Sequence, residues 1–227
     1  MHMTFTVIRS SDVLLAEPDG DSEKYLMQID ARLHHGDSIV GHLHATKILL
    51  RSATDDGQPW FDVCDAHQAT YDVYAAMCED GGDGYRDFLE GFSGSDLLYI
   101  ETVEIAKQFR GHDLGKVMVL ETLNVFESGC AAVVLEPHPI RQNGPVSNEE
   151  DGDAQAWRKA MGWANLALTE DQYAEGAQKL RRYWRKLGFT SVPKSKRFLY
   201  RDCAVNHSVN EKALRKILSG FDADAAP

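Results

Sequence analysis

The sequence predicts an α/β fold built on a mixed, mostly antiparallel sheet. Three observations carry this prediction. The first half of the chain is rich in strand-forming residues. A strand–helix–strand unit lies at the centre of the whole chain, and a well-defined amphipathic helix follows at residues 169–187. A strand–helix–strand unit normally produces two parallel strands with the helix over one face. We therefore expect one parallel pair within an otherwise antiparallel sheet.

Length and composition indicate a single domain spanning residues 1–227. Of the 227 residues, 43% are hydrophobic, enough to bury a substantial core. No stretch approaches the roughly 20 apolar residues that cross a bilayer, and residues 1–12 lack the features of a secretion signal. We expect a cytoplasmic protein with no membrane partner, whose four scattered cysteines are reduced.

The charge balance restricts the class of partner. Asp and Glu total 35 against 24 Lys and Arg, for a formal net charge of -11. Binding to nucleic acid is driven by Lys and Arg contacts to phosphates, so we expect no nucleic acid partner. A cationic substrate is compatible with this charge.

The first half of the chain reads as strands followed by a helix. Three segments are rich in β-formers or alternate polar with apolar residues: residues 4–9, 24–33 and 38–50. Residues 34–37 have the composition of a tight turn, which predicts a β-hairpin. Apolar residues at helical spacing predict a helix within residues 65–77, and glycine and aspartate crowd residues 79–96. We expect the latter segment to be an inserted, exposed loop.

A strand–helix–strand unit contains the most informative loop. Its parts are residues 97–105, 114–127 and 130–136, with Gly129 at the position of a helix C-cap. Arg110-Gly111-His112-Asp113-Leu114-Gly115 joins the first strand to the helix. The first turn of a helix presents unpaired backbone N–H groups and the positive end of the helix dipole. This loop is therefore predicted to bind a pyrophosphate.

The helix that begins after Thr169 is the best defined. Thr169 and Gln172 form a capping box, apolar residues recur at helical spacing as far as Leu187, and Gly188 ends the helix. We expect three shorter elements around it: a helix at residues 157–166, a strand at 197–202 and a last helix at 208–220.

Two segments together resemble the GNAT family of acetyltransferases. Ile105-Ala106-Lys107-Gln108-Phe109-Arg110-Gly111-His112-Asp113-Leu114-Gly115 resembles its coenzyme-binding motif, and Tyr183-Trp184-Arg185-Lys186-Leu187-Gly188-Phe189 resembles its second motif. The resemblance covers residues 97–137 and 169–202. It implies a GNAT acyl-CoA N-acyltransferase fold, with helices on both faces of the sheet and a splayed parallel strand pair around acetyl-CoA.

The same resemblance implies which residues bind the coenzyme. The backbone at Val103 and Ile105 would hold pantetheine, and the loop would hold the pyrophosphate. The residues assigned to the loop are Arg110, Gly111, His112, Asp113, Leu114, Gly115 and Lys116. Asp113 replaces the middle glycine of the family motif. Because Asp tolerates left-handed geometry and is a favoured N-cap, we expect it to cap the helix with its carboxylate turned away from the coenzyme.

Glu136 is the predicted catalytic base. It ends the second strand, where acetyltransferases of ribosomal-protein N-termini carry a glutamate that serves as base. A carboxylate can take the proton that an alkylamine must lose before it attacks a thioester. Glu101 and Glu104 face opposite sides of a regular strand, so one of them could line the site instead. His138 is a further candidate for the base. Alternatively, Glu136 has no catalytic role and only faces solvent at the end of the strand.

The sequence also departs from the family pattern at the position of the general acid. Many relatives carry a tyrosine at the position of Trp184, which has no titratable proton. Tyr183 is the candidate acid beside it, although adjacent helical residues point about 100° apart. Alternatively, both residues only pack against the rest of the protein. Trp184 belongs to the apolar stripe of the helix.

Two other groups of residues are candidate sites. His34, His35, His42 and His44 cluster on the predicted hairpin, and His42 and His44 share one strand face, a spacing found in metal sites. No cysteine or carboxylate pattern accompanies them, so we expect no metal. Arg181, Arg182 and Arg185 are expected to form a solvated face of the capped helix rather than a contact to coenzyme phosphate.

These features predict an N-acetyltransferase that moves an acetyl group from acetyl-CoA directly to a primary amine. The acceptor would be a small molecule or a peptide, and we allow for a homodimer. Residues 139–168 are a second insertion, longer than the corresponding segment in compact family members, where acceptor choice would be determined. A non-catalytic acyl-CoA sensor or scaffold with the same fold is the alternative.

Overall fold

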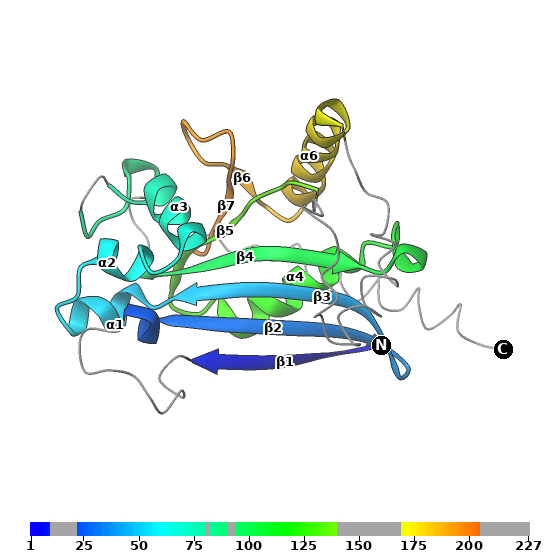
Figure 1. Cartoon of the computed structure of the whole chain (residues 1–227), viewed down its shortest axis with the longest axis horizontal. Coiled ribbons are helices and arrows are strands. Elements are labelled where there is room, and N and C mark those ends of the chain that lie inside the picture. Colours follow the sequence, from blue (N-terminus) through cyan, green and yellow to red (C-terminus); the bar gives the residue numbers. More distant parts are fainter. Residues whose placement is uncertain (10–21, 80–81, 90–93, 140–168, 205–227) are drawn as a thin grey trace, which may run out of the picture.

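Seven strands form one sheet in a computed structural model that describes residues 1–9, 22–79, 82–89, 94–139 and 169–204 (Figure 1). Their order across the sheet is β1-β2-β3-β4-β5-β7-β6. The strands are β1 (His2–Arg9), β2 (Leu26–His35), β3 (Ser38–Ile48), β4 (Asp96–Ile105), β5 (Cys130–Leu135), β6 (Thr190–Ser191) and β7 (Leu199–Asp202). Only β4 and β5 are parallel among these neighbours. The mixed, mostly antiparallel sheet predicted from the sequence is confirmed.

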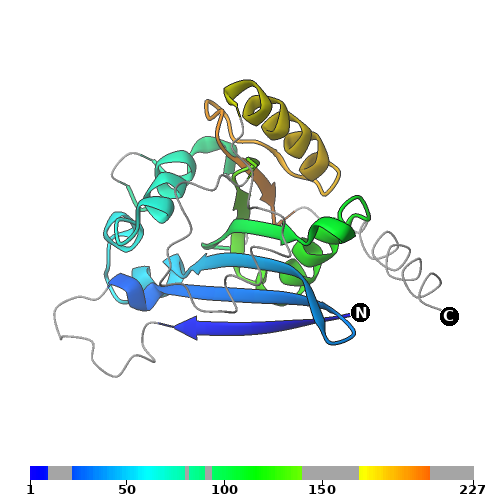
Figure 2. The ribbon, with the colours of Figure 1, turned by 45° about the vertical axis from the view of Figure 1, so that its right-hand side comes forward.

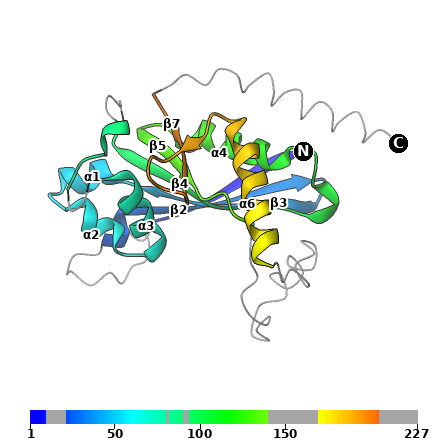
Figure 3. The same ribbon diagram turned by 90° about the horizontal axis from the view of Figure 1, so that it is seen from above.

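Helices cover both faces of the sheet. They are α1 (Leu50–Asp55), α2 (Trp60–Cys64), α3 (Gln68–Met77), α4 (Leu114–Phe126) and α6 (Glu170–Arg185). Alternate residues of β4 divide between two cores: Leu98 and Ile100 pack with α4, whereas Leu97 and Tyr99 pack with α1–α3. Figure 3 shows α1–α3 gathered at one end of the sheet and α6 nearer its middle.

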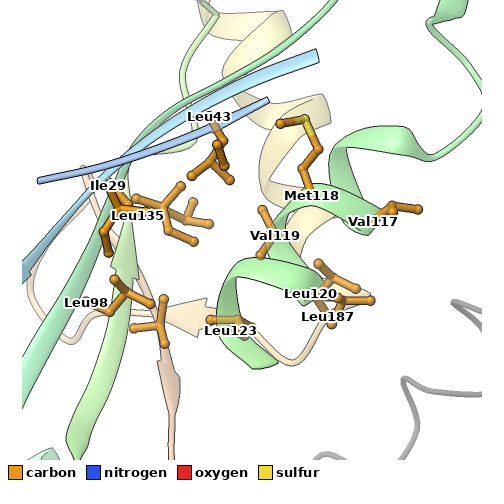
Figure 4. Packing of buried hydrophobic residues seen from close by; sticks show 14 of the residues in the cluster. Ile29, Leu43, Leu98, Val117, Met118, Val119, Leu120, Leu123, Leu135 and Leu187 are labelled. Carbon is orange, nitrogen blue, oxygen red and sulfur yellow. The ribbon is translucent and has the colours of Figure 1, made fainter. Parts of the chain in front are cut away.

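The helix α4 is the centre of the larger core. Its residues Met118, Val119 and Leu123 are buried and point toward the strands, as Figure 4 shows. Gly41 of β3 allows this close approach, because a Cβ atom there would lie 2.6 Å from the sulfur of Met118. The first turn of α4 is thereby held against the sheet beside the end of β4.

Local signals located most of the elements. The capping box at Thr169 is present with both of its hydrogen bonds, and Gly129 and Gly188 adopt positive φ values of 81° and 85°. The helices α1 and α2 and the short strand β6 were not predicted. The expected helices at 157–166 and 208–220 lie outside the described residues, as does nearly all of the second insertion.

Part of the first insertion packs into the smaller core. Tyr85 lies against Trp60 with ring centroids 5.0 Å apart, and its hydroxyl donates a hydrogen bond to the Ser95 carbonyl. This stretch therefore contributes to the core, although we expected residues 79–96 to be an exposed loop. No helix in the described part of the chain is long and apolar enough to span a membrane.

We expect Leu123→Ala to destabilise the protein by about 2–5 kcal/mol, since it removes a side chain that is 1% exposed and leaves a cavity under α4. Val125→Ala, on the same helix but 53% exposed, is the matched control and should change stability by less than about 0.5 kcal/mol. Urea unfolding followed by circular dichroism measures both, and equal effects would contradict this packing.

Candidate functional site

The parallel strands β4 and β5 part near the middle of the sheet. Their pairing runs from Asp96 to Ile100 on β4 and ends at Leu135 on β5. Beyond this point β4 continues to Ile105, paired with β3 alone among the described strands. Backbone groups on the other side of residues 101–105 therefore take no part in the β4–β5 ladder, and a space opens beside them.

A pocket of about 50 Å³ occupies this space between the strands. Its apolar wall consists of Ile100, Val103, Leu135, Leu180 and Trp184. Its polar side carries Glu101, Thr102, Glu136 and His138. The pocket therefore has room for a group of a few heavy atoms, with carboxylates and an imidazole on one side to exchange protons.

A β-bulge at Glu101 sets the direction of the carboxylates on β4. The β3–β4 register shifts at this residue, which is the extra one on β4. Thr46 donates a hydrogen bond to the Glu101 carboxylate, and Glu104 pairs with His42 across the ladder. Because Thr46 and His42 share one face of β3, both glutamates reach that face. The expectation that they face opposite sides was wrong, because it assumed regular alternation; Glu101 is the one that lines the pocket.

Glu136 follows β5 directly and has a partner near each carboxylate oxygen. Arg197 Nε donates a hydrogen bond to Oε2 at 2.7 Å, and His138 Nδ1 lies 3.6 Å from Oε1. The side chain is 17% exposed, so it is held at the pocket rather than turned into solvent. Glu136 thus lines the pocket, and its role as a base stays a prediction.

Arg197 and Asp72 belong to the site and were missed in the sequence. Arg197 lies between β6 and β7 and joins Glu136 to Asp72 of α3. Burial lowers the pKa of the Arg197 guanidinium, but its bonds to Glu136 and Asp72 outweigh this and raise the pKa above its ordinary value. These three residues are far apart in the chain, so no local spacing connects them.

Arg181 of α6 supports the same segment. Its guanidinium donates to the carbonyls of Lys196 and Arg197. Arg185 reaches Ser191 with a nitrogen–oxygen distance of 3.3 Å. The expectation of a solvated basic face was therefore wrong for Arg181, which binds the segment that carries Arg197, whereas Arg185 is exposed. The Lys196 and Arg197 carbonyl oxygens accept from Arg181, a contact between distant segments that sequence spacing does not reveal.

Two left-handed residues shape the loop before α4. A short 3-10 helix, Lys107–Phe109, follows β4, and Arg110 Nε donates to the Ile105 carbonyl at 2.9 Å. Gly111 and Asp113 then adopt φ values of 87° and 59°. These turns place the first residues of α4 at the surface of a cleft, where first-turn N–H groups can face an anion.

This cleft has a volume of about 370 Å³ and lies between the loop and α6, which Figure 2 shows side by side. The loop contributes Phe109, Arg110, Gly111, Asp113, Leu114 and Gly115. The strand β4 contributes Val103 and Ile105, and α6 contributes Lys179, Leu180, Tyr183 and Trp184. Of the predicted coenzyme-binding residues, His112 and Lys116 are not among those that line the cleft, and Lys179 is a lining cation that sequence reasoning missed.

The small pocket and the cleft are neighbours. Val103, Leu180 and Trp184 line both of them. The cleft beside the loop before α4 and the pocket with the carboxylates between β4 and β5 are therefore bordered by the same three side chains.

Asp113 occupies the N-cap position but does not cap α4 with its side chain. Its carboxylate instead pairs with Lys116 Nζ at 2.8 Å. The predicted tolerance of left-handed geometry is confirmed, whereas the predicted capping bond was wrong. N-cap residues that cap have extended backbone geometry, and the left-handed backbone of Asp113 directs its side chain elsewhere. The pair with Lys116 neutralises the carboxylate beside the cleft.

Tyr183 lies beside the loop rather than at the small pocket. Its hydroxyl accepts a hydrogen bond from the Lys116 backbone N–H at 3.2 Å, and Lys116 Nζ lies over its ring. Burial, followed by the nearby Asp113 charge, raises the pKa of Tyr183 above its ordinary value. The predicted role of Tyr183 as acid is untested, and its hydroxyl is placed to contact whatever the loop binds. Trp184 is 6% exposed and packs in the core.

Comparisons with known proteins identify no family. No protein-family model matches the chain, and no curated protein matches it. A search of solved structures finds Arabidopsis thaliana NAA60 in complex with acetyl-CoA, with 13% sequence identity and a TM-score of 0.35. The match covers 90% of this chain and 100% of that chain. A likeness this distant carries no conclusion about activity, which must rest on the residues themselves.

We expect Asp113→Val to be less stable than Asp113→Asn by about 1–2 kcal/mol. Both substitutions remove the ion pair with Lys116, but asparagine tolerates the left-handed backbone and a β-branched residue does not. Urea unfolding measures the stability of each variant, and the difference between the two is the cost of placing a β-branched residue in left-handed geometry. Equal stabilities would show that residue 113 is not left-handed in solution.

Proposed function

We propose that this protein is an acetyl-CoA-dependent N-acetyltransferase of the GNAT type. The observation that carries the proposal is that the cleft at the start of α4 and the pocket between β4 and β5 share three lining residues, so that one donor following this path would reach both. The two ends of this path have different chemistry, an anion-binding helix start at one and carboxylates at the other. That combination suits a long phosphorylated donor with a reactive group at its far end.

The residues of the path fit acetyl-CoA in order. First-turn amides of α4, with Arg110 and Lys179 nearby, supply donors and positive charge for the pyrophosphate. The edge of β4 at residues 101–105, outside the β4–β5 ladder, offers backbone groups to the amides of pantetheine. The apolar wall of the small pocket suits the acetyl methyl group.

The proposed reaction is a direct transfer. The neutral amine attacks the thioester carbonyl, a C–N bond forms, the C–S bond breaks, and coenzyme A leaves as a thiolate that takes up a proton. Glu136 is the proposed base, directly or through water, because its carboxylate is fixed at the pocket. Glu101 and His138 face the same space and are the alternatives.

The proposed acceptor is a primary amine on a small molecule or peptide, and a cationic one is favoured. Glu101 and Glu136 line the pocket, and Asp72 stands beside them through Arg197. Such carboxylates attract an ammonium group before it loses its proton. The overall charge of -11 acts in the same direction at longer range.

A non-catalytic acyl-CoA-binding domain is the second candidate. Three observations favour it. Arg197 already donates a hydrogen bond to the Glu136 carboxylate, and the Tyr183 hydroxyl already accepts one from the Lys116 backbone. Trp184 has no titratable proton to donate. In that case the protein would bind the coenzyme as a sensor or scaffold and release no product.

Acetyl-CoA is expected to raise the melting temperature of the full chain, because a ligand that binds only the folded state stabilises it. Mixing the protein with acetyl-CoA and a panel of polyamines, aminoglycosides and basic peptides should release free coenzyme A thiol with at least one acceptor. Stabilisation without thiol release on any acceptor would support the sensor. Neither effect at saturating acetyl-CoA would refute both candidates.

We expect Glu136→Gln to lower kcat by about 10²–10⁴-fold with little change in acetyl-CoA affinity, since the amide oxygen still accepts from Arg197 but cannot take a proton. Tyr183→Phe should affect acetyl-CoA affinity more than kcat, because its hydroxyl touches the loop. Steady-state kinetics and binding titrations measure both. Asp55→Asn, an exposed carboxylate on α1, is the matched control. Full turnover by Glu136→Gln would remove Glu136 from the reaction.

A further inference from the structure

Three side chains converge on the face of the sheet opposite α4. Asp30 of β2 is directly paired with His44 of β3, and His42 lies two residues earlier on the same face. The two imidazole rings are in contact, with centroids 4.2 Å apart. The ligand-type atoms of all three side chains lie within 4.8 Å of one another. The antiparallel register of the β2–β3 hairpin thus brings a carboxylate to the histidine pair.

The two histidines lie at different distances from the Asp30 carboxylate. His42 Nε2 and Asp30 Oδ1 are both shielded from solvent and lie 3.7 Å apart, too far for a hydrogen bond between them. Two ligand atoms bound tetrahedrally at about 2.1 Å from a metal are about 3.4 Å apart. His44 Nδ1 is in direct contact with the same carboxylate oxygen, so a small side-chain rotation that separates this pair would bring all three atoms to ligand spacing.

We propose that Asp30, His42 and His44 form a binding site for a divalent transition metal, with Zn²⁺ as the best-fitting ion. Two imidazole nitrogens and one carboxylate oxygen are ligands that zinc accepts, whereas Mg²⁺ and Ca²⁺ prefer oxygen ligands alone. Three protein ligands leave one position open for water. This site is separate from the proposed acyl transfer and does not depend on it.

The surroundings of the three residues limit the affinity and supply a further carboxylate. Arg32 of β2 and Glu104 of β4 both pair with His42 across their ladders, so one cation and one anion flank the site. Glu104 is 8% exposed. The side chains of His42, Asp30 and His44 are 19%, 30% and 45% exposed, which leaves a route for an ion from solvent.

This proposal departs from the expectation of no metal. That expectation rested on the lack of a carboxylate near the histidines in the sequence. Asp30 is separated from His42 and His44 by the hairpin turn, and only the strand register shows that it faces them.

Isothermal titration of the EDTA-treated, reduced full chain with Zn²⁺ tests the site. We expect one Zn²⁺ per chain, and His42→Gln, His44→Gln and Asp30→Asn should each weaken binding by at least about tenfold, because each removes a ligand. His67→Gln is the matched control, since His67 also faces a carboxylate, Glu23, at 3.8 Å, but is not part of the three-residue cluster. It should leave the affinity unchanged.

A second measurement identifies the ligands without relying on affinity. Co²⁺ bound at this site should show visible d–d bands without the thiolate charge-transfer band that a cysteine ligand produces, and the bands should be lost in His44→Gln. Circular dichroism of each variant checks that it is folded. No Zn²⁺ binding by the wild-type chain, or binding that survives all three substitutions in folded variants, would overturn the proposal and leave these residues as an ordinary ion-pair cluster.

Discussion

The site depends on a single constraint in the backbone, the early end of the ladder between β4 and β5. Parallel strands that stayed paired to Ile105 would bury the edge of β4 and close the pocket. Pairing with β5 stops at Ile100, and after the bulge at Glu101 the remainder of β4 stays paired with β3 in a shifted register. The positions of Glu136, of the loop before α4 and of the cleft against α6 all follow from that separation.

Charge is distributed along the path in pairs. Asp113 is neutralised by Lys116 at one end, and Glu136 is neutralised by Arg197 at the other. Ion pairs of partly exposed groups add little to stability, so their main effect here is on position and local potential. The aspartate in the loop is thereby compatible with an anion in the cleft, which the sequence alone left in doubt.

Elements with strong local signals could be predicted from the sequence. The capping box at Thr169, the glycine at 129 and the strand–helix–strand unit are patterns within a few residues, and the structure contains each of them. The loop before α4 was located for the same reason. Its side-chain detail was not, because the left-handed backbone at Asp113 changes which groups the carboxylate can reach.

Features that arise from pairing between distant segments could not be predicted. The bulge at Glu101 is a property of the β3–β4 register, and the link from Asp72 through Arg197 to Glu136 joins α3, the β6–β7 segment and the end of β5. The helices α1 and α2 are only six and five residues long, too short for helical periodicity to be visible in the sequence.

The small pocket reaches both faces of the sheet. Val103 lines it from the side that packs with α4, and Glu101 lines it from the side of His42 and Thr46. A donor lying in the cleft beside α4 would therefore approach the pocket from one of these two faces. If the proposed reaction is correct, donor and acceptor can enter from different sides and be bound at the same time, which corresponds to a sequential kinetic order with a ternary complex rather than alternating half-reactions.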